Sequence, residues 1–252
     1  MNNLETPEIA ISLSIGTQEL APQVNRIIEV CAQRNVSPVV VLAGHLTLDP
    51  LGSEKAIETT DHFPSGIVVP ALADEGTFSM AYLKGWQTGS ELATNVISLD
   101  ADGSHDPMQI LDFIDALRRG HQVVLGSRNL PESKNKYPIQ RRMVSNIGTL
   151  VANTFLNPTS QSITDFTSGF EAMSSDVIRA MFANTPASQW ISAAHGPYHL
   201  QNTELRMNLL SLGYPIHEIP ITYGIERSGK SLKLGYIFKA FYGFTLLVKN
   251  CK

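Results

Sequence analysis

Two carboxylates at the end of a short apolar run are the residues of this sequence best suited to chemistry. Asp100 and Asp102 follow Val96–Leu99, which has the composition of a buried strand. Side chains two residues apart on an extended chain point the same way, so both carboxylates can face one ligand. A pair of oxygen donors suits Mg²⁺ or Mn²⁺ carrying a phosphate. Acidic residues and glycine also end strands in ordinary turns, so the pair alone leaves both interpretations open.

The elements that must position this pair are strands alternating with helices. Apolar runs predict the strands, at residues 9–15, 38–43, 66–70, 96–99 and 122–125. The clearest helix signal between them is Asp106 as N-cap with Pro107 in the first turn, ended by Gly120. This alternation calls for right-handed crossovers and predicts an α/β fold with an open, mostly parallel sheet. Ligands of such sheets bind at the carboxyl ends of the strands, which is where Asp100 and Asp102 lie.

Other segments have weaker patterns. Their polar or irregular composition predicts loops at residues 44–64, 129–138 and 187–200. A spacing of four predicts a helix within residues 75–91, and its aromatic residues are assigned to the core rather than to sugar stacking: Phe78, Tyr82 and Trp86. Residues 139–156 predict a helix with one apolar face, formed by Met143, Ile147, Leu150 and Val151. Residues 216–223 alternate as a strand does.

Composition excludes several classes of protein. A net charge of −4 gives no reason to expect a nucleic-acid partner, although basic residues cluster at 118–142 and 227–249. Such clusters fit phosphate groups or an anionic membrane surface. Cys31 and Cys251 have no metal-ligand spacing, and we expect no disulfide. The N-terminus lacks the features of a signal peptide, and no uncharged apolar run is long enough to span a membrane, which predicts a cytoplasmic protein.

Seven motifs in a fixed order carry a resemblance to a known family. They are Asp100-Ala-Asp102, His105-Asp-Pro107, Gly126-Ser-Arg128, Asp165-Phe-Thr-Ser-Gly-Phe170, Glu204, Glu218-Ile-Pro-Ile221 and Arg227-Ser-Gly-Lys-Ser231. In this order they resemble the inverting family 2 glycosyltransferases, and among those the dolichol- or polyprenyl-phosphate mannose or glucose synthases. The resemblance covers residues 9–233. It rests on the order of the motifs, since no single one is decisive.

The resemblance implies a Rossmann-like, glycosyltransferase A-type fold in a single domain, with helices on both faces of the sheet. Residues 1–128 would form the nucleotide-sugar half and residues 129–233 the acceptor half. Residues 234–252 would form a C-terminal amphipathic segment that either packs on the sheet or lies in a membrane interface. The implied donor is a UDP- or GDP-linked sugar, the acceptor is a lipid phosphate, and the cofactor is Mg²⁺ or Mn²⁺. The protein would then act in cell-envelope glycan synthesis as a peripheral protein at the inner face of the membrane.

The same resemblance assigns roles to residues. Asp100 and Asp102 would hold the metal that bridges the donor diphosphate and neutralises the leaving group. Donor binding falls to Glu19, Asp100, Arg227, Lys230 and Ser231, and acceptor-phosphate binding to Arg128, Arg141 and Arg142. Arginine suits phosphate because it binds it bidentately. Asp165 would lie close to the acceptor, and the catalytic set would be Asp102, Asp165 and Arg128.

Two alternatives limit these roles. An ionised phosphate acceptor needs no general base, so Asp165 would act as one only on a hydroxyl acceptor. Arg128 and Asp165 could instead form a structural ion pair.

Departures from the family pattern fall on the nucleotide side. The segment 14–19 keeps only Glu19 of the usual Pro-x-x-Asn-Glu motif, and residues 42–45 read Leu-Ala-Gly-His in place of Asp-Asp-Gly-Ser. Ser104 replaces a metal-contacting Gln. A catalytically impaired relative that binds a nucleotide or a partner protein therefore stays open as an alternative.

Two other classes use similar acidic motifs. A haloacid-dehalogenase-type phosphatase also places Asp-x-Asp-Gly after a strand, and it stays open although no later acidic pair of the expected form follows. An EF-hand fails because its twelfth position, counted from Asp100, is Leu111.

Overall fold

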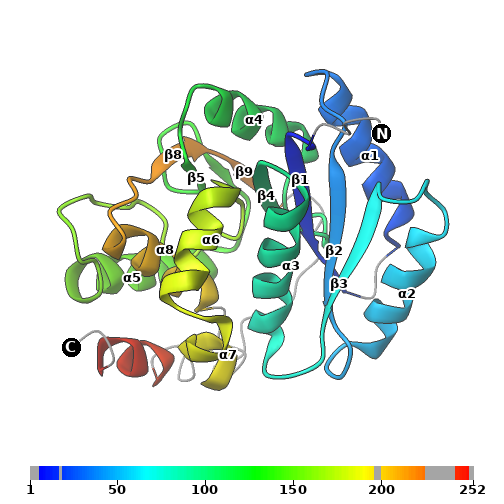
Figure 1. Ribbon diagram of the computed structural model, residues 1–252. Coiled ribbons are helices and arrows are strands. Elements are labelled where there is room, and N and C mark those ends of the chain that lie inside the picture. Colours follow the sequence, from blue (N-terminus) through cyan, green and yellow to red (C-terminus); the bar gives the residue numbers. More distant parts are fainter. Residues whose placement is uncertain (1–5, 17–18, 196–199, 225–241, 250–252) are drawn as a thin grey trace.

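A seven-stranded sheet forms the centre of the computed structural model, which describes residues 6–16, 19–195, 200–224 and 242–249 (Figure 1). Its strands lie in the order β3 (Val68–Ala73), β2 (Val39–His45), β1 (Ile9–Ser14), β4 (Asn95–Asp100), β7 (Glu171–Ser174), β5 (Val123–Ser127) and β8 (His217–Pro220). Neighbours pair in parallel except β7, which runs antiparallel to β4 and β5. The fold is therefore the mostly parallel α/β sheet that the alternation predicts.

Helices cover both faces of this sheet. One face packs against α1 (Ala21–Ala32), α2 (Pro50–Thr60) and α4 (Ile110–Arg118). The other packs against α3 (Phe78–Leu92), α5 (Ile139–Phe155), α6 (Ser175–Asn184), α7 (Ile191–His195) and α8 (Gln201–Ser211). Because both faces are covered, the central strands are apolar along their whole length, and every residue of β2 is buried.

Local signals explain where several helices begin. The Asp106 side chain accepts a hydrogen bond from the Met108 amide, and a 3₁₀ turn, Pro107–Gln109, leads into α4. Gly120 follows α4 with a φ of +94°, a left-handed conformation that glycine adopts without strain. These are the start and stop predicted from sequence, and both are confirmed.

Three predictions of loops were wrong in part. Residues 44–64 contain α2, which Asp49 caps by accepting from the Gly52 amide and which buries only small residues, so no apolar period marks it. Residues 129–138 contain β6 (Lys134–Asn135), which pairs with β9 (Thr222–Tyr223), and residues 187–200 contain α7. The strand expected at 216–223 is divided into β8 and β9, and β7 was missed.

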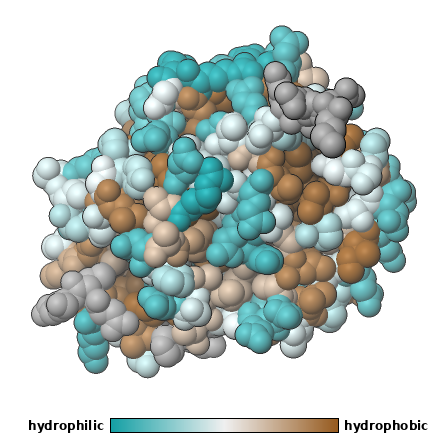
Figure 2. Space-filling model, viewed as in Figure 1, coloured by the Kyte–Doolittle hydropathy of each residue, from teal (hydrophilic) through white to brown (hydrophobic). Residues whose placement is uncertain are grey.

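The apolar face of α5 turns away from the core. Met143, Ile147 and Leu150 are each at least 47% exposed, whereas amphipathic helices normally bury such residues. Apolar side chains are visible at the lower left of Figure 2, the region where Figure 1 shows α5 and the C-terminal helix. The side of α5 that faces the protein is instead made of small or polar residues, among them Gly148 and Thr149.

Of the predicted C-terminal segment, the structure describes residues 242–249, which form a helix. Leu247 is buried in the core, and Phe244 lies beside Gly148 of α5, while Tyr242 is exposed. This part therefore packs on the domain. Within the described ranges, every helix is too short or too polar to cross a bilayer.

Candidate active site

Asp100 is the last residue of β4 and Asp102 lies in the turn that follows, both at the carboxyl edge of the sheet. The Tyr82 hydroxyl of α3 donates to Asp100 Oδ1 at 2.7 Å, and His105 Nε2 lies 3.8 Å from Asp100 Oδ2. Asp102 Oδ1 accepts from the Ser104 amide at 3.1 Å, and Gly103 takes a positive φ. The two carboxylates thus belong to a real turn, and they also lie where ligands of such sheets bind.

Tyr82 remains a hydrogen-bond donor to Asp100. Burial, together with the nearby negative charge of Asp100, raises the pKa of Tyr82 well above its ordinary value. The phenol is therefore protonated at neutral pH and fixes one oxygen of the carboxylate. This residue, assigned from sequence to the core, supports the site.

His105 is buried beside the same carboxylate. Its ring lies edge-on to Phe170 and tilted against Tyr223, with centroid separations of 4.9 and 4.8 Å. Neither ring nitrogen has a hydrogen-bond partner in the described chain. A buried polar atom without a partner is costly, and it is a common sign of a ligand or ion.

The donor set fits a divalent cation only in part. Asp100 and Asp102 supply hard oxygen donors, and His105 supplies an orphaned nitrogen next to one of them. Among the described residues, no three His, Cys, Asp or Glu side chains are grouped closely enough to hold a metal ion. A cation at this turn would therefore take further ligands from water or from a bound diphosphate.

Arg128, directly after β5, forms a bidentate ion pair with Asp165. The Nε–Oδ2 and Nη2–Oδ1 distances are 2.7 and 2.8 Å, and the Arg128 amide also donates to Oδ2. Nη2 further donates to Ser145 of α5 and to Thr167. The structural ion pair that the sequence left as an alternative is therefore present.

Arg128 and Asp165 each keep the other in its ionised form. Burial alone would raise the pKa of Asp165, but Arg128 and the amide donors outweigh it, so the pKa lies below its usual range. Burial likewise opposes the charge of Arg128, and Asp165 more than offsets it, so the pKa of Arg128 is raised. Asp165 is thus ionised with both oxygens bound, and it orients the guanidinium.

Tyr223 of β9 connects the two halves of this edge. The Arg128 guanidinium carbon lies 5.0 Å from the Tyr223 ring centroid, and the rings of His105 and Tyr137 also pack against Tyr223. Tyr137 donates to the Tyr223 hydroxyl at 3.3 Å, and Arg141 lies 5.1 Å from the Tyr137 ring. The carboxylates after β4 and the arginines after β5 therefore border one continuous aromatic group.

Other acidic residues of the predicted motifs hold the backbone in place. Glu204 accepts from the amides of Ile191 and Ser192 at the start of α7, and Glu218 accepts from the Thr164 amide. Burial raises the pKa of both carboxyls, although these hydrogen bonds oppose the shift. Both are structural.

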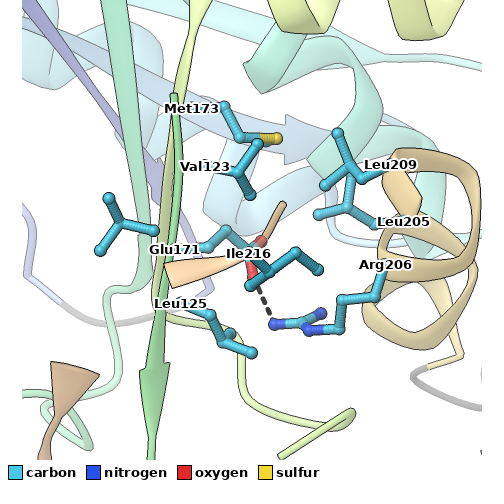
Figure 3. Close-up of a pocket in the computed structure, with 9 residues that line it drawn as sticks. Val123, Leu125, Glu171, Met173, Leu205, Arg206, Leu209 and Ile216 are labelled. Atoms are coloured by element: carbon cyan, nitrogen blue, oxygen red, sulfur yellow. Dashed lines mark hydrogen bonds and ion pairs between the residues drawn. The ribbon is translucent and has the colours of Figure 1, made fainter. Parts of the chain in front are cut away.

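A buried ion pair supports the loop between Asp165 and β7. Arg206 of α8 lies 2.8 Å from Glu171 and also donates to the carbonyl of Ser168. Figure 3 shows the two side chains pointing at each other in the lining of a small cavity. The rest of the cavity lining is apolar: Val123, Val124, Leu125, Met173, Leu205, Leu209 and Ile216. None of the predicted site residues lines it, so this cavity is separate from the predicted site.

The nucleotide side of the same edge has few interactions. Glu19, 82% exposed, forms an ion pair with Lys55 of α2 at 3.0 Å. His45 is buried, and its ring nitrogens contact the Glu75 carbonyl and the Leu48 amide. His45 therefore takes a structural role where the family motif ends in serine, and buried Leu42 and Ala43 stand where that motif has its two aspartates.

The remaining predicted residues are less informative. Arg142 is exposed on the first turn of α5, beside Arg141. Arg227, Lys230 and Ser231 lie outside the described residues. Sequence reasoning missed Tyr82, Tyr137 and Tyr223 as site residues, since a single tyrosine carries no pattern.

Comparisons with known proteins agree with the motif order. The chain is 32% identical over 159 residues to an undecaprenyl-phosphate mannosyltransferase of Micrococcus luteus, covering 62% of this chain and 60% of that protein. It is 25% identical over 174 residues to a polyprenol monophosphomannose synthase of Mycolicibacterium smegmatis, covering 68% and 62%. The chain thus spans about three fifths of the curated relatives it matches. No family model matches the sequence.

Solved structures decide the fold. Glucosyl-3-phosphoglycerate synthase of Mycobacterium tuberculosis, in a complex with Mn²⁺ and UDP, superposes with a TM-score of 0.58 at 14% identity, covering 96% of this chain and 80% of that one. Mannosyl-3-phosphoglycerate synthase of Rubrobacter xylanophilus gives 0.64 at 11% identity, covering 97% and 73%. The chain has the glycosyltransferase A-type fold. The predicted fold class and the resemblance to polyprenyl-phosphate mannosyltransferases are confirmed.

Proposed function

We propose that this glycosyltransferase-fold protein transfers a sugar from a nucleotide-sugar donor to a polyprenyl phosphate at the inner face of a membrane, inverting the anomeric carbon. The observation that carries the proposal is the junction at Tyr223, which lies between Arg128 and the His105–Asp100 pair. Diphosphate and acceptor phosphate would then bind on the two sides of this ring. The similarity to polyprenyl-phosphate mannosyltransferases supports the same acceptor class.

Donor binding rests on the carboxylates after β4. Asp100 and Asp102 would hold Mg²⁺ or Mn²⁺, which when bound supplies positive charge to the leaving diphosphate. Tyr82 fixes Asp100 through Oδ1, so that this carboxylate is oriented before the ligand arrives. Glu19, Arg227, Lys230 and Ser231 would complete the donor site.

Acceptor binding rests on the arginines after β5. Asp165 holds Arg128 through two of its guanidinium nitrogens, and Arg141 and Arg142 follow on the first turn of α5. Arg128 and Arg141 lie over neighbouring rings, Tyr223 and Tyr137, and guanidinium groups there would suit a phosphate better than a neutral hydroxyl.

The reaction is a single in-line displacement. An oxygen of the acceptor phosphate forms the new bond to the anomeric carbon, while the bond from that carbon to the diphosphate oxygen breaks and the nucleoside diphosphate leaves with the electron pair. The nucleophile is already ionised, so no group must remove a proton. Asp165 accordingly stays ionised and serves by orienting Arg128.

The test compares Asp102→Asn with Asp176→Asn, a surface carboxylate of α6 paired with Arg179. Purified protein is assayed with UDP- and GDP-sugars, Mn²⁺ and a polyprenyl phosphate. We expect Asp102→Asn to lower turnover at least about a hundredfold and Asp176→Asn to leave it unchanged. Full turnover by Asp102→Asn would contradict the role of that residue.

A binding protein without transferase activity is the second candidate. It is favoured by buried Leu42 and Ala43, which stand where the family motif has its two aspartates, one of them a contact to the nucleotide base. Calorimetry with UDP- and GDP-sugars and Mn²⁺ separates the candidates. Binding without turnover would favour the binding protein, and hydrolysis of an aryl phosphate would point to a phosphatase.

A further inference from the structure

Helix α5 has its large and small residues on the opposite sides from those of an ordinary surface helix. Ile139, Met143, Ile147 and Leu150, at spacings of four, four and three, form one stripe and are 66%, 57%, 47% and 66% exposed. We call these four residues the α5 stripe. A stripe of exposed large apolar residues marks an interaction surface rather than a packing face.

The inward side of α5 is occupied by bonded polar groups, so the helix cannot simply rotate to bury the stripe. Ser145 is bound to Arg128, and the Thr149 hydroxyl accepts from the Phe166 amide. Asn153 donates to the Ile163 carbonyl and accepts from the Ile163 amide. The orientation of α5 is therefore fixed by the same contacts that build the Arg128 site.

The stretch of sequence that carries the stripe is basic. Residues 133–164 contain four basic residues and no Asp or Glu, in a chain whose net charge is −4. Lys134, Lys136 and Arg142 are exposed beside the start of the stripe. An apolar stripe with a basic border is complementary to a bilayer with anionic headgroups, because apolar side chains enter the acyl boundary while cations bind lipid phosphate.

The stripe is continuous with the proposed acceptor site. It begins at Ile139, two residues before Arg141, whose guanidinium lies over Tyr137 of the aromatic group. A lipid whose phosphate reaches Arg141 therefore has its hydrocarbon chain next to the first stripe residues. No soluble partner would need this juxtaposition of apolar stripe and phosphate site.

We propose that the α5 stripe is the surface by which this protein docks on an anionic membrane, and that it lies in the headgroup–acyl boundary. The inference rests on the proposed function, because it places the acceptor's lipid tail at this helix. The sequence-based expectation concerned a different segment, residues 234–252, for which packing on the sheet and membrane contact were both left open.

The experiment measures binding of the full chain to vesicles in the absence of donor and acceptor. Vesicles of phosphatidylcholine with phosphatidylglycerol are compared with pure phosphatidylcholine by co-sedimentation. The stripe variant carries Ile147→Glu and Leu150→Glu. The matched control carries Leu51→Glu and Ile57→Glu on α2, where the two residues are 56% and 48% exposed.

We expect wild type and control to bind the anionic vesicles with equal affinity, and the stripe variant to bind them at least about tenfold more weakly than wild type. Binding by wild type and control should weaken as the salt concentration rises. Equal binding by stripe variant and control would overturn the proposal. So would a dimer, seen by light scattering, that the stripe variant abolishes while no protein binds vesicles.

A second assay separates this proposal from the proposed function. Transfer to a short, water-soluble prenyl phosphate is measured without vesicles, where the stripe variant should match wild type. If no variant transfers sugar but vesicle binding follows the stripe, the function fails and the docking surface stands. If transfer occurs and vesicle binding ignores the stripe, only the docking surface fails.

Discussion

The carboxyl edge of the sheet has two unlike regions. After β4 and β5, His105 and Tyr223 lie between Asp100 and Arg128, and Arg128 forms a buried ion pair with Asp165. After β1 and β2, the predicted donor residue Glu19 is 82% exposed with Lys55 as its ion partner, and His45 is bonded to the backbone.

We call the region after β4 and β5 the phosphate half and the region after β1 and β2 the base half, after the roles proposed for them. The difference indicates that the two halves do not depend on each other for their structure. Charged groups taken out of water need several partners, so the phosphate half is a network that tolerates few changes. An exposed ion pair such as Glu19–Lys55 contributes little to stability, so its residues can be substituted without loss of the fold. The four predictions below test this contrast, from the largest expected effect to the smallest.

Replacing Arg128 should have the largest effect. Arg128→Met leaves Asp165 charged and buried without its partner, which costs about 3–5 kcal/mol of unfolding free energy, and it should lower sugar transfer by at least about a hundredfold. Urea unfolding and transfer rates measure both. Arg119→Met, at the exposed end of α4, is the control. A stable, active Arg128→Met protein would show that the region after β4 and β5 tolerates substitution as well as the region after β1 and β2 does.

Removing one hydroxyl tests the support of Asp100. Tyr82→Phe keeps the ring but loses the 2.7 Å hydrogen bond to Asp100. We expect Mn²⁺-dependent binding of UDP or GDP to weaken by about tenfold, because the carboxylate is no longer oriented. Calorimetry measures the affinity, with exposed Tyr242→Phe as the control. Unchanged affinity would show that Asp100 does not depend on α3.

Glu171 makes the stability of the phosphate half depend on pH. Burial raises the pKa of Glu171 to about 7, although Arg206 opposes the shift. The folded state then binds a proton that the unfolded state, with a Glu pKa of about 4.3, has released, so this group's contribution to stability falls as pH rises from about 4 to about 7.

Urea unfolding at about pH 5 and about pH 7 tests this dependence. Glu171→Gln should have a lower free energy of unfolding than wild type, and that free energy should depend less on pH. Glu91→Gln, exposed on α3, should keep the pH dependence of wild type. The same slope in all three proteins would show that Glu171 titrates normally.

The smallest effect is expected at Glu19. Glu19→Gln removes an exposed ion pair, worth no more than about 1 kcal/mol, and should change the apparent affinity for the donor by less than about fivefold. Titration with UDP- and GDP-sugars measures it, with Lys55→Gln testing the same pair from α2. If Glu19→Gln impaired the protein as strongly as Asp102→Asn, the base half would matter as much as the phosphate half.

The sequence predicted the parts of this fold that depend on period and position. Parallel strands, the capped start of α4 and the place of Asp100 and Asp102 at a strand end follow from apolar runs and turn residues. Helix α2 was not predicted because it buries the small residues Gly52, Ser53 and Ala56, which give no apolar period. Strand β7 was not predicted because its four residues are too few to show an alternation of apolar and polar side chains.

The site was predictable as a set of charges but not as a geometry. Arg128 and Asp165 could be named from motifs, yet only the folded chain shows the carboxylate bound to the guanidinium on two atoms. Tyr82 and Tyr223 come from α3 and β9, far apart in sequence, and a lone aromatic residue gives no signal of where it will lie. Such long-range pairs are set by topology.

Strand β7 has a further consequence. It is inserted between the strands that lead to Asp100 and Arg128, and adjacent strands lie about 4.8 Å apart, so the two ends are held about 10 Å from each other. Under the proposed function, that gap would accommodate a hexose between a departing and an arriving phosphate. The antiparallel strand thus works as a fixed spacer, and changes in its length or register would reset which acceptors can reach the donor.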